Sequence, residues 1–308
     1  MRKYTLPLLL LLLTVFSGLV NATAGATTAS IPTVGYSWDH PIITVQISPE
    51  QTASWFKPSF ASDVSSGIER WTESIAVFTD AYGFKYLRQL RFSIYITGVN
   101  QTSSPDVEIS FINSDPSFVG VTRYTRTGTG YFQKPVTTQL ATFDSSNTRQ
   151  LIDNDMTNIA MHEFGHALGL GHASTEFTND SFLELMYTSY EFPIGNPGST
   201  LEEPSSLDVY ALSQIYSWIP SSPPLTGKPV TTITLPTGIA YTALIPYKDQ
   251  VTSLQNFIQS QNLKIIVLAV LAAVFFVATL ALAIAYLRKK ATPLPPLIPA
   301  TEPPPSIA

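Results

Sequence analysis

The stretch that decides the fold reads, from residue 162 to residue 172, His162-Glu163-Phe164-Gly165-His166-Ala167-Leu168-Gly169-Leu170-Gly171-His172. Residues four positions apart share one face of a helix, so the imidazoles of His162 and His166 can reach the same metal ion. Glycine adopts the left-handed conformation that ends a helix and turns the chain. Gly169 and Gly171 therefore predict a turn that brings His172 back towards that ion as a third ligand.

Three histidine ligands predict a zinc site, because Zn²⁺ favours nitrogen donors in a tetrahedral arrangement. Three protein ligands leave the fourth position open for water, which is typical of a catalytic rather than a structural zinc. Glu163 follows the first ligand and is not needed to complete the site. We therefore expect Glu163 to act as a general base that takes a proton from the activated water and returns it to a leaving amine.

An ordinary helix with core histidines is the alternative to this metal site. Only four histidines occur in the 308 residues, and three of them fall in this one stretch with the required glutamate and glycines. That placement disfavours the alternative, although a bare HExxH pattern would be weak by itself. The fourth histidine, His40, precedes Pro41, and we expect it to be a surface or cap residue.

The N-terminal segment has the pattern of a signal peptide. The basic start Met1-Arg2-Lys3 is followed by an apolar run from Leu8 to Val20 and then by small residues. This pattern predicts a signal peptide over residues 1–30, cleaved near residues 24–30. An uncleaved signal anchor is the alternative.

The second apolar segment, Ile265 to Leu287, is interrupted only by Thr279 and Tyr286. It is long enough to cross a hydrocarbon core of roughly 30 Å, and it predicts one transmembrane helix over residues 264–287. Arg288-Lys289-Lys290 follow it directly. The positive-inside rule then places the proline-rich tail, residues 288–308, in the cytoplasm, and the preceding domain outside the cell membrane.

Composition excludes several classes of function. The net charge of −5 gives no electrostatic support to nucleic-acid binding. The chain contains no cysteine, which excludes disulfides, thiol catalysis and cysteine-ligated zinc. An extracytoplasmic domain without disulfides must take its stability from its core or from a bound metal.

Periodicity predicts one α+β domain over residues 31–219, followed by a linker or stalk rich in Pro, Thr and Ser over residues 220–263 with a little β structure near residues 230–235. Strands are expected at His40–Ser48, Leu90–Thr97, Asp106–Ile112 and Gln139–Phe143. Helices are expected at Pro58–Phe78, at Met156–Leu170 with Asp153 or Asp155 as N-cap, and at Ser206–Trp218 with Ser205 or Ser206 as N-cap. Residues 120–135 are expected to form either a long loop or an edge hairpin.

The extended pattern HExxHxxGxxH is the signature of the metzincin clan of zinc endopeptidases, and within it the chain resembles the matrixin family, the matrix metalloprotease-like branch. The resemblance covers roughly residues 31–219. Glu184-Leu185-Met186-Tyr187 is similar to the Met-turn, whose methionine lies beneath the zinc ligands, which makes Met186 a supporting residue. The stretch from Ser206 to Leu212 is similar to the family's closing helix.

The resemblance implies a twisted mixed sheet packed on helices, with a zinc cleft between two lobes. It implies a metalloendopeptidase whose protein or peptide substrate lies extended along the edge strand. Tyr187, Thr188 and the residues that follow up to Pro197 would wall the specificity pocket. The family's proline after Met-Tyr is Thr188 in this chain, so the family's substrate preference does not carry over.

Two departures concern cofactors and regulation. The additional histidines of a structural zinc are missing, so the resemblance implies one catalytic zinc only. Calcium binding by loop carboxylates such as Asp144, Asp153 and Asp180 stays open beside their being simply solvated. Without cysteine, latency through a cysteine switch is excluded.

Two other functions compete with a membrane-anchored endopeptidase. One is a non-catalytic, zinc-stabilised binding or adhesion module at the cell surface, which would have no use for Glu163. The other is a zinc hydrolase with a non-peptide substrate, since a fold never proves a substrate.

Overall fold

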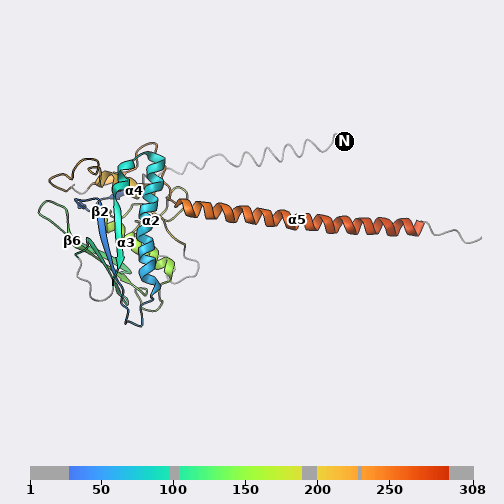
Figure 1. The fold of residues 1–308 in the computed structure, drawn as a ribbon, viewed down its shortest axis with the longest axis horizontal. Coiled ribbons are helices and arrows are strands. Elements are labelled where there is room, and N and C mark those ends of the chain that lie inside the picture. The colour runs from blue at the N-terminus through green and yellow to red at the C-terminus, as the bar shows by residue number, and fades with distance from the viewer. Residues whose placement is uncertain (1–27, 98–103, 189–199, 228–230, 291–308) are drawn as a thin grey trace, which may run out of the picture. The chain divides into compact units, whose positions relative to one another are not determined.

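The computed structural model describes residues 28–97, 104–188, 200–227 and 231–290 (Figure 1). The chain divides into two compact units, one ending at Tyr247 and the other beginning at Lys248. Nearly all of the expected signal peptide, and the tail after residue 290, lie outside the described residues.

A five-stranded mixed sheet forms the centre of the first unit. Its strand order is β3-β2-β4-β6-β5, and every neighbouring pair is parallel except β5 with β6. The strands are β2 (Ile42–Ser48), β3 (Arg91–Ile96), β4 (Val107–Ile112), β5 (Gly120–Arg126) and β6 (Phe132–Ala141). The expected twisted mixed sheet is present, and β5 is one of its two edge strands.

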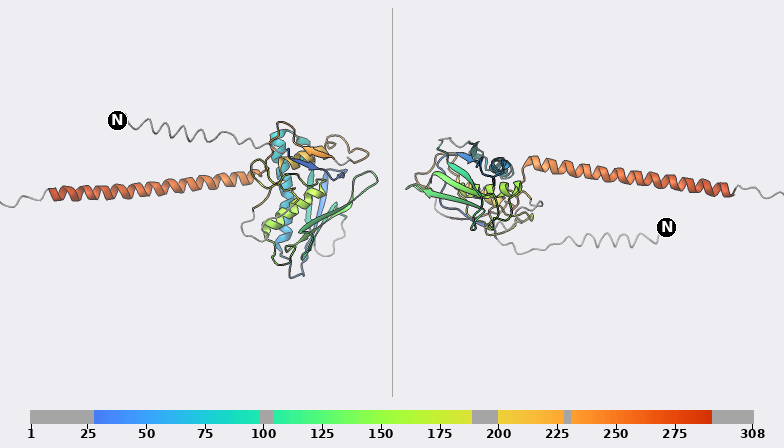
Figure 2. Two further views of the ribbon diagram at one scale, coloured as in Figure 1. Left: turned by 180° about the vertical axis from the view of Figure 1, so that it is seen from behind. Right: turned by 90° about the horizontal axis from the view of Figure 1, so that it is seen from below.

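Two long helices pack together against this sheet, α2 (Ser59–Tyr82) and α3 (Asp153–Ala167). Figure 2 shows both helices beside the sheet from two further sides. The apolar stripe of α2 faces the alternating apolar residues of the central strands, and all of these side chains are buried: Phe60, Val64, Ile68, Trp71, Ile75, Phe78, Ile43, Val45, Ile47, Val107, Ile109 and Phe111. Each contributes roughly 1.5–3 kcal/mol by leaving water, which makes α2 a rigid support for α3.

The β5–β6 hairpin corrects one predicted strand. The strand expected over Gln139–Phe143 instead begins at Phe132, and the edge hairpin, rather than the long loop, is the right alternative for residues 120–135. The reason is that β5 is an edge strand with no fully buried residue, so its sequence lacks the apolar alternation of a strand with one face in the core.

The helix bounds also differ from expectation. Helix α3 begins at Asp153 rather than Met156, and its N-cap is Ile152. Asp155 occupies the third helical position, where its carboxylate accepts the Ile152 backbone N–H at 3.0 Å. Helix α4 (Ser206–Ile215) begins after the expected Ser205 cap but ends three residues before Trp218, and α2 continues beyond Phe78 to Tyr82.

Residues 231–247 differ from the expected linker because they pack on the domain. Strand β7 (Thr232–Thr234) pairs with β1 (Ser30–Pro32), so the little β structure expected here is present. Tyr241 and Leu244 are buried in the same core as the helices. Widely spaced apolar residues in a Pro- and Thr-rich segment carry no periodic signal, which is why composition alone suggested a linker.

Helix α5 (Tyr247–Lys290) contains the expected transmembrane segment 264–287 and begins well before it. It is long and apolar enough to cross a membrane, and among the described residues it is the one helix that is.

Candidate metal centre

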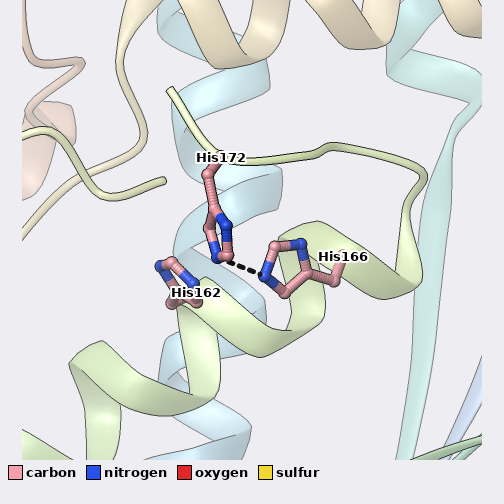
Figure 3. A group of neighbouring side chains, drawn as sticks. All are labelled: His162, His166 and His172. Atoms are coloured by element: carbon pink, nitrogen blue, oxygen red, sulfur yellow. Dashed lines mark hydrogen bonds between the residues drawn. The ribbon is translucent and has the colours of Figure 1, made fainter. Parts of the chain in front are cut away.

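Three imidazoles converge at the end of α3. His162 and His166 lie one turn apart on the helix, and His172 reaches them from the segment that follows it (Figure 3). One ring nitrogen from each lies within 4.8 Å of the other two, and the Nε2 atoms of His166 and His172 are 3.2 Å apart. Three nitrogen donors gathered around one point fit the ligand set of a zinc ion.

Backbone carbonyls orient two of these rings. The Nδ1 of His162 lies 2.6 Å from the Leu185 carbonyl, and the Nδ1 of His166 lies 2.8 Å from the Leu170 carbonyl. A carbonyl only accepts, so each Nδ1 carries the proton and each Nε2 keeps its lone pair for a metal. Burial lowers the pKa of His162 to about 3 and that of His166 to about 4. Both rings therefore stay neutral, as metal ligands must.

Helix α3 ends in a turn in which Gly169 and Gly171 have different roles. Gly169 has a φ of 104°, and the amides of Gly169 and Leu170 bond back to the carbonyls of His166 and Gly165, which closes the helix in a Schellman motif. Gly171 has no positive φ. The Gly171 amide donates to the Pro32 carbonyl at 2.7 Å. A side chain at this position would not fit, because an added Cβ would lie 2.8 Å from the same oxygen.

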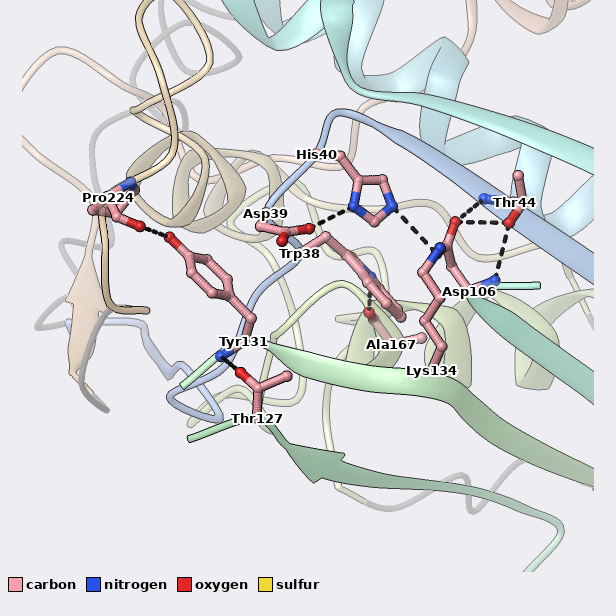
Figure 4. A network of polar contacts seen from close by, with 10 residues as sticks. All are labelled: Trp38, Asp39, His40, Thr44, Asp106, Thr127, Tyr131, Lys134, Ala167 and Pro224. Carbon is pink, nitrogen blue, oxygen red and sulfur yellow. Dashed lines mark hydrogen bonds and ion pairs between the residues drawn. The ribbon is translucent and has the colours of Figure 1, made fainter. Parts of the chain in front are cut away.

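The carbonyls that α3 leaves at its C-terminal end are bound by buried aromatic side chains. The Trp38 indole donates to the Ala167 carbonyl at 2.9 Å (Figure 4), and the Tyr216 hydroxyl donates to the Leu168 carbonyl at 3.0 Å. These two bonds hold the turn on which the position of His172 depends.

Met186, the methionine of the turn that resembles the Met-turn, packs against helix α3 at Gly165. Its side chain is fully buried, and an added Cβ on Gly165 would clash with its sulfur, so the absence of a side chain at Gly165 makes room for Met186. Tyr187 closes the turn by donating its amide to the Glu184 carbonyl at 3.0 Å. The same turn supplies the Leu185 carbonyl that orients His162.

Glu163 lies between two cavities beside the histidines. One, of about 300 Å³, is lined by Ser117, Phe118, Val119, Gly120, Ile159, His162, Glu163, His172 and Thr188. The other, of about 340 Å³, is lined by Val34, Gly120, Val121, Thr122, Tyr124, Glu163, His166, Gly171 and His172. Burial raises the pKa of Glu163 to about 7, and a hydrogen bond from Thr122 acts in the opposite direction. A carboxyl with a raised pKa in a cleft suits general acid–base chemistry.

The remaining sequence-based candidates have mixed outcomes. Thr188 lines the first cavity, but residues 189–197 of the expected pocket wall lie outside the described residues. His40 is not a simple surface residue, because it is half-buried between Asp39 and Asp106, and Lys134 also pairs with Asp106 (Figure 4). Within the described ranges, the three histidines are the only cluster of His, Cys, Asp or Glu found that could hold a metal. Calcium binding stays a prediction.

Sequence reasoning missed the residues that surround Glu163. Thr122 and Gly120 of β5 contact its side chain, and neither belongs to a motif or to an apolar pattern. Only the register of the edge strand over α3 brings them there, so no local signal could have found them.

Comparison with known protein families decides the identity of this fold. Residues 37–217 match the family model of Matrixin. The chain belongs to the matrixin family. Like other matrixins it therefore contains a zinc metallopeptidase domain, and its three clustered histidines could hold the metal.

Individual proteins add little to this matrixin assignment. No curated protein matches the chain. Among solved structures, it is similar to a chain of the GM1-bound form of the ECX AB5 holotoxin, with 14% identity, a TM-score of 0.30, and coverage of 65% of this chain and 84% of that chain. A likeness this remote carries no argument about the matrixin's function.

Proposed function

We propose that this matrixin is a zinc-dependent endopeptidase, anchored in the cell membrane by α5 with its catalytic domain outside. The observation that carries the proposal is the convergence of three neutral imidazoles with a buried, non-ligating Glu163 at a cleft along the edge strand. When bound, zinc supplies the Lewis acidity that activates a water molecule and polarises the scissile carbonyl.

The chain's own residues would supply the rest of the chemistry. His162, His166 and His172 hold the ion. Glu163 accepts the proton of the attacking water and delivers it to the nitrogen of the leaving amine. The outer edge of β5 offers backbone groups to which an extended peptide can add as a further strand. The two cavities on either side of Glu163 would receive side chains of that peptide.

The competing binding module is disfavoured by Glu163. A zinc kept only for stability needs four ligands and no buried carboxyl beside them. Burying a carboxyl costs free energy, and the structure holds Glu163 next to the histidines without using it as one of the three clustered donors.

The test uses the full chain in detergent micelles, loaded with zinc and incubated with an unfolded protein. We expect the wild type to release peptides, and Glu163→Ala to release them about 10²–10⁴-fold more slowly while keeping its zinc. A folded, zinc-bound wild type that cleaves neither unfolded proteins nor a peptide library would overturn the proposal. Equal hydrolysis rates for the wild type and Glu163→Ala would exclude Glu163 as the general base while leaving the zinc-dependent activity in place.

A further inference from the structure

We propose that Gly120 and Thr122 of edge strand β5 form a cradle that sets the position of the Glu163 carboxylate, with Thr122 as a positioning residue. The inference rests on the proposed role of Glu163 as general base. Glu163 belongs to α3 and the cradle belongs to β5, so the geometry of the base depends on the strand along which the substrate is proposed to lie.

The first side of the cradle is a hydrogen bond. The Thr122 hydroxyl lies 2.8 Å from Glu163 Oε2 and 3.0 Å from the Glu163 carbonyl. An ionised carboxylate only accepts hydrogen bonds, so Thr122 is the donor in this pair. Bonds of this kind to a charged acceptor are about twice as strong as neutral ones, and more so when water is excluded.

A second threonine orients the Thr122 hydroxyl. The Oγ1 of Thr138, on the neighbouring strand β6, lies 3.0 Å from the Oγ1 of Thr122, and Thr138 is 1% exposed. The single proton of Thr122 points to Glu163, so Thr138 must be the donor to Thr122. Two paired strands thus present one directed donor to the carboxylate.

The second side of the cradle is the missing side chain of Gly120. A Cβ there would lie 2.7 Å from Glu163 Cγ, 2.8 Å from Glu163 Oε1 and 2.7 Å from Ile159 Cγ2. The φ of Gly120 is not positive, so close approach rather than backbone conformation requires a glycine here. Gly120 and Thr122 together fix the position of the carboxylate. Its Oε2 accepts the hydrogen bond from Thr122, and its Oε1 is the oxygen that would accept the proton of the attacking water.

Three variants and a matched control, each as the full, zinc-loaded chain in detergent, test this cradle by peptide hydrolysis. Displacing a base by about 1 Å can cost as much as 100-fold, so Thr122→Val should lower kcat by between about tenfold and 100-fold. KM should change by less than about twofold, and zinc affinity should be unchanged. Thr122→Ser keeps the hydroxyl and should restore kcat. Gly120→Ala should lower kcat through displacement of Glu163, with zinc retained.

The matched control is Thr234→Val, the same substitution at an exposed threonine on strand β7, away from the strand along which the substrate is proposed to lie, and it should leave kcat unchanged. A second readout does not depend on activity. Urea unfolding of the wild type, Thr122→Val, Glu163→Ala and the double variant should show that the effect of Thr122→Val shrinks once Glu163 is removed.

The outcomes separate the cradle from the proposed function. A Thr122→Ser variant as slow as Thr122→Val, a change confined to KM, or additive unfolding midpoints would overturn the cradle while leaving the peptidase intact. A wild type without hydrolytic activity would refute the general base and its positioning together. If the urea unfolding midpoints of the single and double variants were still non-additive, the contact between Thr122 and Glu163 would exist but would serve no proton transfer.

Discussion

At the scale of single residues, most of the candidate centre follows from sequence spacing. His162 and His166 must share a face wherever a helix forms, because four residues make about one turn. Gly169 was expected to end the helix, and its φ of 104° does so. The same reasoning wrongly gave Gly171 a left-handed conformation, because a glycine required by close approach looks no different in sequence from one required by φ.

Gly169→Ala should therefore weaken zinc binding as well as stability. A Cβ at Gly169 would meet the Tyr36 carbonyl at 2.7 Å, and the left-handed φ adds roughly 1–2 kcal/mol of strain, so the turn that carries His172 must shift. Zinc affinity is measured by competition with a chelator, and stability by urea unfolding.

Gly83→Ala is the matched control for that variant. Gly83 has a φ of 83° and ends α2, yet nothing lies within 4 Å of an added Cβ. Gly83→Ala should lower the free energy of unfolding only by the strain of the left-handed φ. Its zinc affinity should equal that of the wild type. Equal zinc affinity in both variants would show that the Gly169 turn does not set the position of His172.

At the scale of elements, buried carboxyl groups join the Met-turn to α4. The Glu184 carboxylate accepts the Tyr241 hydroxyl at 2.6 Å, and Asp208 accepts the Ser205 amide at 2.8 Å as part of the α4 capping box. Burial raises the pKa of both carboxyls, which lie within hydrogen-bonding reach of each other. Glu202 is buried close by, and burial together with the charges of Glu184 and Asp155 raises its pKa to about 8.

Stability should therefore fall as pH rises through the range set by Glu202. Its pKa is about 4.3 in an unfolded chain, so between that value and about 8 the folded state holds a proton that the unfolded state has lost. The contribution is complete below about pH 4 and is lost as pH rises through 8, with a slope of at most about 1.4 kcal/mol per pH unit for this one proton.

Urea unfolding across that pH range checks this prediction. Glu202→Gln removes the titrating group and should flatten the profile relative to the wild type. Glu50→Gln makes the same substitution at an exposed glutamate and should keep the wild-type slope. Parallel profiles for the wild type and Glu202→Gln would mean that Glu202 is ionised in the folded protein.

The segment after α4 also belongs to the domain rather than to a linker. Tyr241→Ala should cost about 3–5 kcal/mol of unfolding free energy, because it removes a buried ring and leaves the Glu184 carboxylate short of a donor. Leu225→Ala, at a side chain that is 93% exposed in the same segment, should change stability by less than about 0.5 kcal/mol. If Tyr241→Ala were as stable as Leu225→Ala, the segment after α4 would be a linker that does not contribute to the folded domain.

At the scale of the whole molecule, we expect α5 to hold the protein at a membrane. Its apolar stretch has the length and composition of a membrane span. We expect the full chain to stay with membranes after alkaline extraction, and a chain ending at Tyr247 to be released. External protease should remove the catalytic unit from intact cells. Release of the full chain by alkali would contradict the anchor.

Sequence patterns were enough to predict the α+β class, the clustering of His162, His166 and His172, and the long apolar helix. Each of these depends on periodicity or on spacing within one short segment, and such relations hold before the chain folds. Packing between distant parts of the chain decided which strand lies over Glu163, that residues 231–247 pack on the core, and that the carboxyl groups of Glu184, Asp208 and Glu202 lie close enough to interact. Those contacts join residues far apart in the chain, and their positions come from the packing of the sheet on α2 and α3, which no local pattern encodes.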